Sequence, residues 1–381
     1  MTNKRFAIIG GGIAGLTTAI ALNNIGINPE IFESAPTIKG IGAGLVLAAN
    51  AIKGFQALAI ADEIIQQGRL LSSFILYDEK GKEIIKTNSQ EISKKYGADN
   101  FTISRAALHK LLLSKLDPAR IHPGKQVFNL ERSKNSVLIK FNDNTYHETD
   151  FVVAADGIHS AVRKKLLPEA LPRYAGYTCW RAIIDNSNLN LTESSETWGT
   201  RGRFGIVPLT GNEIYWFACI NAPGNDRKMQ EMKIKDLANI FKDYHQPIPE
   251  ILRGTKDENL IWNDIIDLKP TNQFAFDNIV LIGDAAHATT PNMGQGACQA
   301  VEDAVVLADE LNTNSNYITA FKKFEQRRIK RTRFIVNRSW NIGKMAQTDN
   351  KILAGLRNFL FRQVPAGFNE QQIKKLYDVD F

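Results

Sequence analysis

The sequence predicts an α/β fold with a parallel sheet, an inserted antiparallel sheet and a C-terminal helical segment. Three runs that are apolar except for Asn278 predict the parallel sheet, because strands buried on both faces show no polar alternation. These runs are Phe6–Ile9, Val152–Ala155 and Asn278–Ile282, and a glycine follows each within two residues. Apolar and polar residues alternate in Ser72–Lys86 and Tyr174–Ala222, which predicts the antiparallel sheet. Helical spacing of apolar residues predicts a long helix over Tyr317–Gln347.

Length and composition are those of a globular protein. The 381 residues are enough for two packed domains, and 44% hydrophobic with 23% charged residues is ordinary for such a chain. A formal net charge of +7 suits an anionic ligand such as a dinucleotide. Because the basic residues are spread widely, we expect no nucleic-acid partner.

Cysteine usage and hydropathy favour a cytoplasmic protein. Cys179, Cys219 and Cys298 are odd in number and too far apart in sequence for a metal or redox pair, so we expect reduced thiols. The N-terminus enters a strand without an apolar leader, and no stretch reaches the ~18 uninterrupted apolar residues of a spanning helix. We therefore expect no integral membrane association.

The first apolar run leads into the turn Gly10-Gly11-Gly12-Ile13-Ala14-Gly15 and then into a helix. In this context the glycines allow a tight turn, close approach to a pyrophosphate and close helix packing, while the helix N-terminus binds phosphates. Glu33 ends the next apolar run, eighteen residues after Gly15, where a carboxylate binds ribose hydroxyls and disfavours a 2′-phosphate. The segment predicts a Rossmann-like dinucleotide-binding domain.

Polar residues follow the other two apolar runs, where crevices of open parallel sheets bind ligands. Asp156-Gly157, which alone would be typical of a plain turn, follows the second run, and Gly283-Asp284 follows the third. Asp284 is suited to accept hydrogen bonds from a polyol chain. A helix beginning near Gly296 presents amides that can stabilise negative charge on a bound dinucleotide. The residues at its start are Pro291, Gly294, Gln295, Gly296 and Ala297.

Together these segments resemble the class A FAD-dependent monooxygenases with the para-hydroxybenzoate hydroxylase fold, such as urate hydroxylase, salicylate hydroxylase and the zeaxanthin epoxidase catalytic domain. The resemblance covers nearly the whole chain. It implies that the glycine-rich turn binds the diphosphate of a non-covalent FAD, that Asp156-Gly157 serves both FAD and the pyridine nucleotide, and that Asp284 holds the ribityl chain. Ser104-Arg105 resembles the family's arginine near the flavin diphosphate.

The resemblance also implies the reaction. NADH or NADPH reduces the flavin as a transient co-substrate, since the chain has no second glycine-rich turn to retain it. O2 then adds at the flavin C4a position, and the hydroperoxide transfers one oxygen atom to a small-molecule substrate. The six histidines lack the spacing of metal ligands, so we expect no metal site. His287 is expected to be structural although it lies near Asp284.

Arg203 and Tyr215 are candidate substrate-positioning residues, because they match positions that face the substrate in urate hydroxylase. Such a pair would fix a small, anionic aromatic or heteroaromatic ring through a charge-assisted hydrogen bond. In the alternative interpretation, Arg203 forms a structural ion pair and Tyr215 is a core aromatic residue. Hydroxylation is the favoured activity. The alternatives with this fold are an epoxidase, an antibiotic-modifying monooxygenase, a flavin reductase and a non-catalytic flavoprotein regulator.

The segments predict three structural units. The FAD-binding domain is discontinuous and comprises residues 1–71, 98–172 and 267–312. The substrate domain comprises residues 72–97 and 173–266, and the helical segment comprises residues 313–381. We expect a monomer or a homodimer. In the helical segment Ile352–Phe361 is amphipathic, which raises the hypothesis of a lipid contact.

Overall fold

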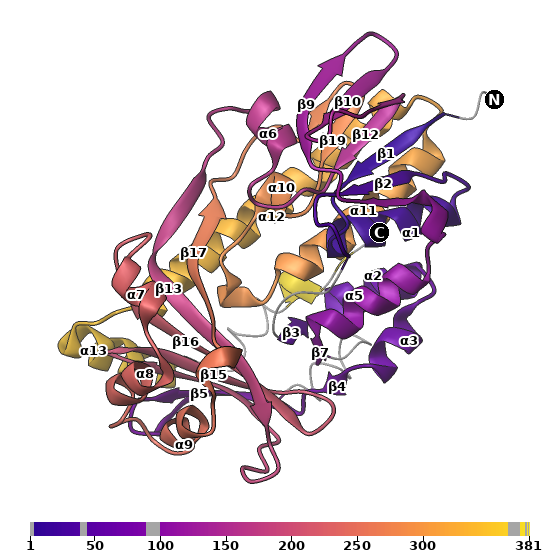
Figure 1. Ribbon diagram of the computed structural model, residues 1–381. Helices are drawn as coiled ribbons and strands as arrows, with labels where there is room; N and C mark the ends of the chain where they lie inside the picture. The colour runs from indigo at the N-terminus through magenta and orange to yellow at the C-terminus, as the bar shows by residue number, and fades with distance from the viewer. Residues whose placement is uncertain (1–3, 39–43, 89–99, 365–373, 378, 380) are drawn as a thin grey trace.

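The computed structural model describes residues 4–38, 44–88, 100–364, 374–377, 379 and 381. A six-stranded sheet and a seven-stranded sheet dominate it, at the upper right and the lower left of Figure 1. The strands of the six-stranded sheet are, in spatial order, β18 (Ala275–Phe276), β19 (Ile279–Leu281), β12 (Phe151–Ala154), β1 (Phe6–Ile9), β2 (Glu30–Glu33) and β8 (Ile121–Pro123). All neighbours in it are parallel except β18 and β19.

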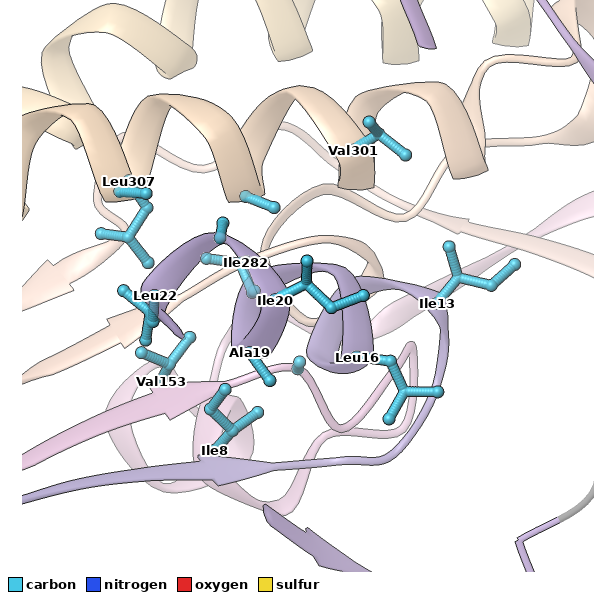
Figure 2. Packing of buried hydrophobic residues seen from close by; sticks show 14 of the residues in the cluster. Ile8, Ile13, Leu16, Ala19, Ile20, Leu22, Val153, Ile282, Val301 and Leu307 are labelled. Atoms are coloured by element: carbon cyan, nitrogen blue, oxygen red, sulfur yellow. The ribbon is translucent and has the colours of Figure 1, made fainter. Parts of the chain in front are cut away.

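The three apolar runs become adjacent central strands of the six-stranded sheet. β12 pairs with β1 on one side and with β19 on the other, so their carboxyl ends lie at one edge. Helix α1 (Ile13–Asn24) packs between this sheet and α11 (Gly296–Thr313), as Figure 2 shows. Ile8, Val153 and Ile282 face α1 from the sheet side, and Val301 and Leu307 face it from α11. All five are essentially inaccessible to solvent, which places the main core here.

The seven-stranded sheet forms the second half of the molecule. Its spatial order is β17 (Ile261–Leu268), β13 (Pro172–Asp185), β16 (Glu213–Asn221), β15 (Gly202–Pro208), β14 (Ser194–Gly199), β5 (Ser73–Asp78) and β6 (Glu83–Asn88). Neighbours are antiparallel except β14 and β5, which run parallel. That pair joins two segments far apart in sequence, and no hairpin connects them. One face of the sheet packs on α8 (Ile234–Ile240) and α9 (Ile248–Arg253) in a second core.

The remaining elements connect or cover the two large sheets. Two three-stranded sheets consist of β3 (Gly44–Leu47), β7 (Phe101–Ser104) and β4 (Arg69–Leu70), and of β11 (Tyr146–Thr149), β10 (Val137–Phe141) and β9 (Val127–Arg132). The other helices are α2 (Ala49–Ala57), α3 (Ala61–Gln66), α5 (Arg105–Ser114), α6 (Ala161–Leu166), α7 (Arg227–Glu231), α10 (Asp284–His287), α12 (Tyr317–Ala346) and α13 (Lys351–Arg362). Short 3-10 helices are η1 (Pro118–Arg120), η2 (Asp257–Asn259) and η3 (Pro291–Met293).

The predicted α/β class, with a Rossmann-like parallel sheet, an inserted antiparallel sheet and a helical C-terminal segment, is confirmed. The boundary expected between residues 97 and 98 lies outside the described residues. Within the part of the chain that the structure describes, no helix has the length and apolar character needed to cross a membrane.

Candidate active site

A cavity of about 380 Å³ lies between the two large sheets. One side, which we call the loop wall, consists of Gly12, Ile13, Ala14, Gly44, Leu45, Val46, Arg105, Ala155, Gly157, Asp284, Thr289, Pro291, Asn292, Gly294, Gly296, Ala297 and Ala300. The other, the sheet wall, consists of Cys179, Arg181, Glu196, Arg203, Val207, Tyr215, Phe217, Cys219 and Ile265. The loop wall gathers the segments that follow β1, β12 and β19. The sheet wall is the face of the seven-stranded sheet turned away from α8 and α9.

Gly10, Gly12 and Gly15 of the glycine-rich turn differ in what a Cβ atom at each position would meet. Gly10 has a φ of +107°, and a Cβ there would lie 2.3 Å from the Ala155 carbonyl oxygen. A Cβ on Gly15 would lie 1.9 Å from the Gly10 carbonyl oxygen, so α1 can approach β1 this closely only with glycine. A Cβ on Gly12 would meet no atom within 4 Å and would project into open space. Gly10 and Gly15 therefore shape the turn, while Gly12 keeps the cavity side of it open.

Glu33 lies behind the loop wall and not in the cavity. Its carboxylate accepts hydrogen bonds from the Gly11 amide at 2.7 Å and from the Ala35 amide at 2.7 Å. It therefore fixes the glycine-rich turn to the end of β2. The Ser34 hydroxyl also donates to this carboxylate at 3.0 Å, and because a carboxylate has about four acceptor positions, capacity remains for a ribose hydroxyl.

Asp284 and Arg105 project opposite charges into the cavity from the loop wall. Neither side chain has a hydrogen bond or ion pair with another described residue. The Asp284 side chain is exposed, but the space it faces is enclosed by protein. Burial accordingly raises the pKa of its carboxyl above the usual range, while His287, Arg105 and Arg163 oppose that rise. Both groups are thus available to a ligand.

Asp156 and Gly157 contribute to the turn that follows β12 in different ways. One carboxylate oxygen of Asp156 accepts from the Val162 amide at 3.3 Å, and the other is buried without a partner. Burial raises the pKa of this carboxyl. Gly157 lines the cavity at a φ of +78°, and a Cβ there would meet nothing within 4 Å. An unpaired buried oxygen beside an open glycine is an arrangement that a ligand with donor groups would complete.

The loop that precedes α11 contributes mainly backbone to the cavity. Pro291, Gly294, Gly296 and Ala297 line it. Gln295 is buried with its side chain turned away, where it accepts hydrogen bonds from Asn50 and Gln299, each at 3.0 Å. The Gln295 side chain therefore does not face the cavity.

A buried ion-pair network supports the loop wall from behind. Asp303 on α11 accepts from the Gly283 amide at 2.7 Å, from His287 Nε2 at 2.6 Å and from Arg328 Nε at 2.6 Å. Burial alone would raise the pKa of Asp303, but His287 and Arg328 outweigh it and lower the pKa to about 2. Arg328 also pairs with Glu302. Asp303 thus anchors the Gly283-Asp284 turn, and His287 has the structural role expected from the sequence.

Arg203 and Tyr215 both line the cavity but differ in their partners. The Arg203 guanidinium pairs with Glu196 at 3.2 Å and donates to Asn292 Oδ1, while its Nε is buried and unpaired. These contacts match the structural ion pair that was the alternative interpretation. The Tyr215 hydroxyl has no hydrogen-bond partner among the described residues. Burial raises the pKa of Tyr215, so it is a neutral donor at physiological pH.

Several cavity residues were not predicted from the sequence. Asn292 accepts from the Tyr177 hydroxyl at 3.1 Å and from Arg203, and it donates to the Ser339 carbonyl at 2.9 Å, so it connects the seven-stranded sheet, η3 and α12. Cys179 and Cys219 lie directly opposite one another on β13 and β16. From their separation in sequence, the cysteines were expected to be reduced thiols that form no metal or redox pair. The strand register, which the sequence does not specify, brings them together.

Comparisons with known proteins agree with this geometry. A family model described as "FAD binding domain" matches residues 4–319. The chain is 35% identical over 364 residues to the aurachin C monooxygenase/isomerase of Stigmatella aurantiaca, covering 95% of each chain. It is 31% identical over 373 residues to the 2-heptyl-3-hydroxy-4(1H)-quinolone synthase of Pseudomonas aeruginosa, covering 97% of each. The crystal structure of Klebsiella pneumoniae HpxO complexed with FAD and uric acid superposes with a TM-score of 0.91 at 25% identity, over 99% of this chain and 96% of that one.

These matches span almost the entire chain and both walls of the cavity. The chain therefore belongs to the FAD-binding domain family, within the class A FAD-dependent monooxygenases of the para-hydroxybenzoate hydroxylase fold. FAD is the cofactor of this family, and the chain is an oxidoreductase of the aromatic and heteroaromatic hydroxylase type.

Proposed function

We propose that this protein uses NADH or NADPH and O2 to hydroxylate a bicyclic heteroaromatic substrate of the quinolone type. The observation that supports this most is one cavity whose loop wall is largely backbone and whose sheet wall combines apolar side chains with Tyr215 and the Arg203–Glu196 ion pair. The relatives that are 35% and 31% identical to this chain support the substrate class, because the second is named a quinolone synthase.

FAD fits the loop wall on the evidence of this chain's own residues. Gly12 and Gly157 leave open the space that a Cβ would fill, and the amides at the start of α1 are free to meet a diphosphate there. Arg105 would neutralise part of the diphosphate charge, and the unpartnered Asp284 carboxylate would accept ribityl hydroxyls. Gly10, Gly15 and Glu33 would act indirectly, by fixing the turn.

The flavin ring would lie against the backbone of Pro291, Gly294, Gly296 and Ala297. There the N-terminus of α11 would favour negative charge on the reduced ring. When bound, FAD supplies the redox chemistry: it accepts a hydride from the pyridine nucleotide and, with O2, supplies the inserted oxygen atom. The transient nicotinamide would approach through the Asp156-Gly157 side.

The sheet wall would hold the substrate ring over the flavin and keep water away. Val207, Phe217 and Ile265 supply apolar contact. Tyr215 would donate a hydrogen bond to a ring carbonyl. Arg203 would polarise the same region while its charge is balanced by Glu196, and Arg181, which also lines the cavity, has no ion pair among the described residues. Tyr215 and Arg203 are positioning residues in this account.

The test is oxidation of NADH and of NADPH by the purified yellow protein, with hydrogen peroxide release recorded in parallel. The panel is 2-heptyl-4-quinolone, 4-quinolone, urate, salicylate and a tetracycline. We expect the alkylquinolone to stimulate oxidation without equivalent peroxide release. Stimulation by urate or salicylate instead would overturn the substrate class, and oxidation that no compound affects would favour the flavin reductase or regulator.

A further inference from the structure

Helix α13 presents an apolar stripe to solvent. Ile352, Leu353, Leu356, Phe359 and Leu360 are all more than half exposed, and Ile352 is 81% exposed. They recur at intervals of one, three and four residues, which places them on one side of a helix. Most exposed large apolar residues of a protein are scattered singly. Five on a single 12-residue helix form a continuous surface.

The opposite side of α13 is anchored, so the stripe is held outward. Ala354 and Asn358 are buried, and the Phe361 ring lies 5.9 Å from that of Trp198. The Arg357 guanidinium lies over Trp198, and Arg362 pairs with Asp78 at 2.7 Å. The stripe therefore does not turn inward without breaking these contacts. Figure 1 shows α13 at the outer left edge of the molecule, beside the seven-stranded sheet.

The charges of α13 have one sign. Lys351, Arg357 and Arg362 are basic, and the helix contains no acidic residue. Lys351 is exposed beside the stripe, whereas Arg357 and Arg362 are half-buried in the contacts just described, and Asp78 balances the charge of Arg362. An exposed apolar stripe on a helix whose charged residues are all basic is found in helices that lie in the plane of a membrane surface. The net charge of +7 acts in the same direction at longer range.

We propose that α13 docks the protein onto an anionic lipid bilayer, with the stripe at the level of the headgroups and the acyl-chain boundary. A helix of this length extends about 18 Å and is able to lie flat there. An alkyl-substituted substrate would be enriched in the same bilayer. Enrichment of the substrate in the bilayer rests on the proposed function, whereas the docking surface does not.

A second copy of the chain is a poorer occupant. A symmetric contact through one stripe would bring the like charges of two basic helices together. Stable dimers bury roughly 1,200–2,000 Å² in total, which is more than one short helix from each copy provides. Lipid headgroups, by contrast, supply both the apolar layer and the opposite charge.

Sedimentation of the full-length, flavin-loaded protein with vesicles tests the proposal. Vesicles of phosphatidylcholine alone are compared with vesicles that also contain phosphatidylglycerol. We expect binding to the anionic vesicles that weakens with added salt. Phe359→Glu should lower the partition coefficient at least roughly tenfold, because it removes an inserted ring and adds a charge that resists burial.

A matched control is available, since Phe128 on β9 is 58% exposed, the same as Phe359. Phe128→Glu adds the same charge elsewhere and should leave vesicle binding within about twofold of the parent. Circular dichroism and the flavin spectrum verify that both variants are folded. No binding to anionic vesicles, or equal losses in both variants, would overturn the proposal. So would a parent dimer in sedimentation velocity that Phe359→Glu dissociates. Turnover without vesicles, measured separately, reports on the proposed function alone.

Discussion

The two walls of the cavity are built by different means. The loop wall is largely backbone: glycines and amides at the ends of parallel strands and at helix N-termini, with Asp284 and Arg105 as its charged side chains. The sheet wall is made of side chains that alternate along antiparallel strands, with their neighbours buried in the other core. A wall of backbone suits a constant ligand, whereas a wall of side chains changes with each substitution. Mutations should therefore impair cofactor binding and substrate binding in different ways.

The largest effect on stability is expected in the buried ion-pair network behind the loop wall. Arg328→Leu leaves Glu302 and Asp303 buried with fewer counter-charges, which should reduce the free energy of unfolding by about 3–5 kcal/mol. Its neighbour Arg327 pairs with Asp309 and Glu310 near the surface. Arg327→Leu should therefore cost no more than about 1 kcal/mol. Urea unfolding of both variants measures the difference, and equal losses would contradict the supporting role of the network.

A pair of glycine substitutions separates turn geometry from ligand approach. Gly12→Ala should leave the melting temperature of the flavin-free protein close to that of the parent but weaken FAD binding by about a hundredfold, because its methyl projects into the open side of the turn. Gly15→Ala should destabilise the flavin-free protein as well, since its Cβ meets the Gly10 carbonyl. Flavin fluorescence titration and thermal melting distinguish them. Unchanged FAD affinity in Gly12→Ala would place the diphosphate elsewhere.

Acidification should weaken the anchor of the Gly283-Asp284 turn. The pKa of Asp303 falls from 3.8 to about 2 on folding, so its contribution to stability is complete above about pH 4 and is lost as the pH falls toward 2. The loss corresponds to about 2 kcal/mol. It should appear as a difference in unfolding free energy between the parent and Asp303→Asn that shrinks over this interval. A difference that stays constant with pH would show that the carboxyl has an ordinary pKa.

The smallest expected effect is that of a substitution at Tyr215 on the sheet wall. Tyr215→Phe removes one hydrogen bond to the substrate and should raise KM about tenfold, equivalent to about 1.4 kcal/mol, while FAD affinity stays unchanged. Tyr146→Phe, at an exposed residue on β11, is the control. A loss of FAD affinity in Tyr215→Phe would mean that the two walls do not divide their roles as described.

Sequence alone predicted most of the loop wall and little of the sheet wall, for a physical reason. Positive φ at Gly10 and the 1.9 Å approach at Gly15 allow only glycine, so the turn is visible as a pattern of residue types. The ion pair of Arg203 with Glu196 depends on the antiparallel register of β14 and β15, and the role of Asn292 depends on how η3 packs against the seven-stranded sheet. Alternation predicts which face a residue occupies but not its cross-strand neighbour. For the same reason the contact between Cys179 and Cys219 was not predicted.

Turnover of the preferred quinolone under ¹⁸O2, with the product analysed by mass spectrometry, tests the central claim most directly. We expect a hydroxylated product that carries one atom of ¹⁸O from dioxygen, with one NADH or NADPH consumed per product. A product whose new oxygen comes from water, or NAD(P)H consumption that yields only hydrogen peroxide with every heteroaromatic compound, would contradict it.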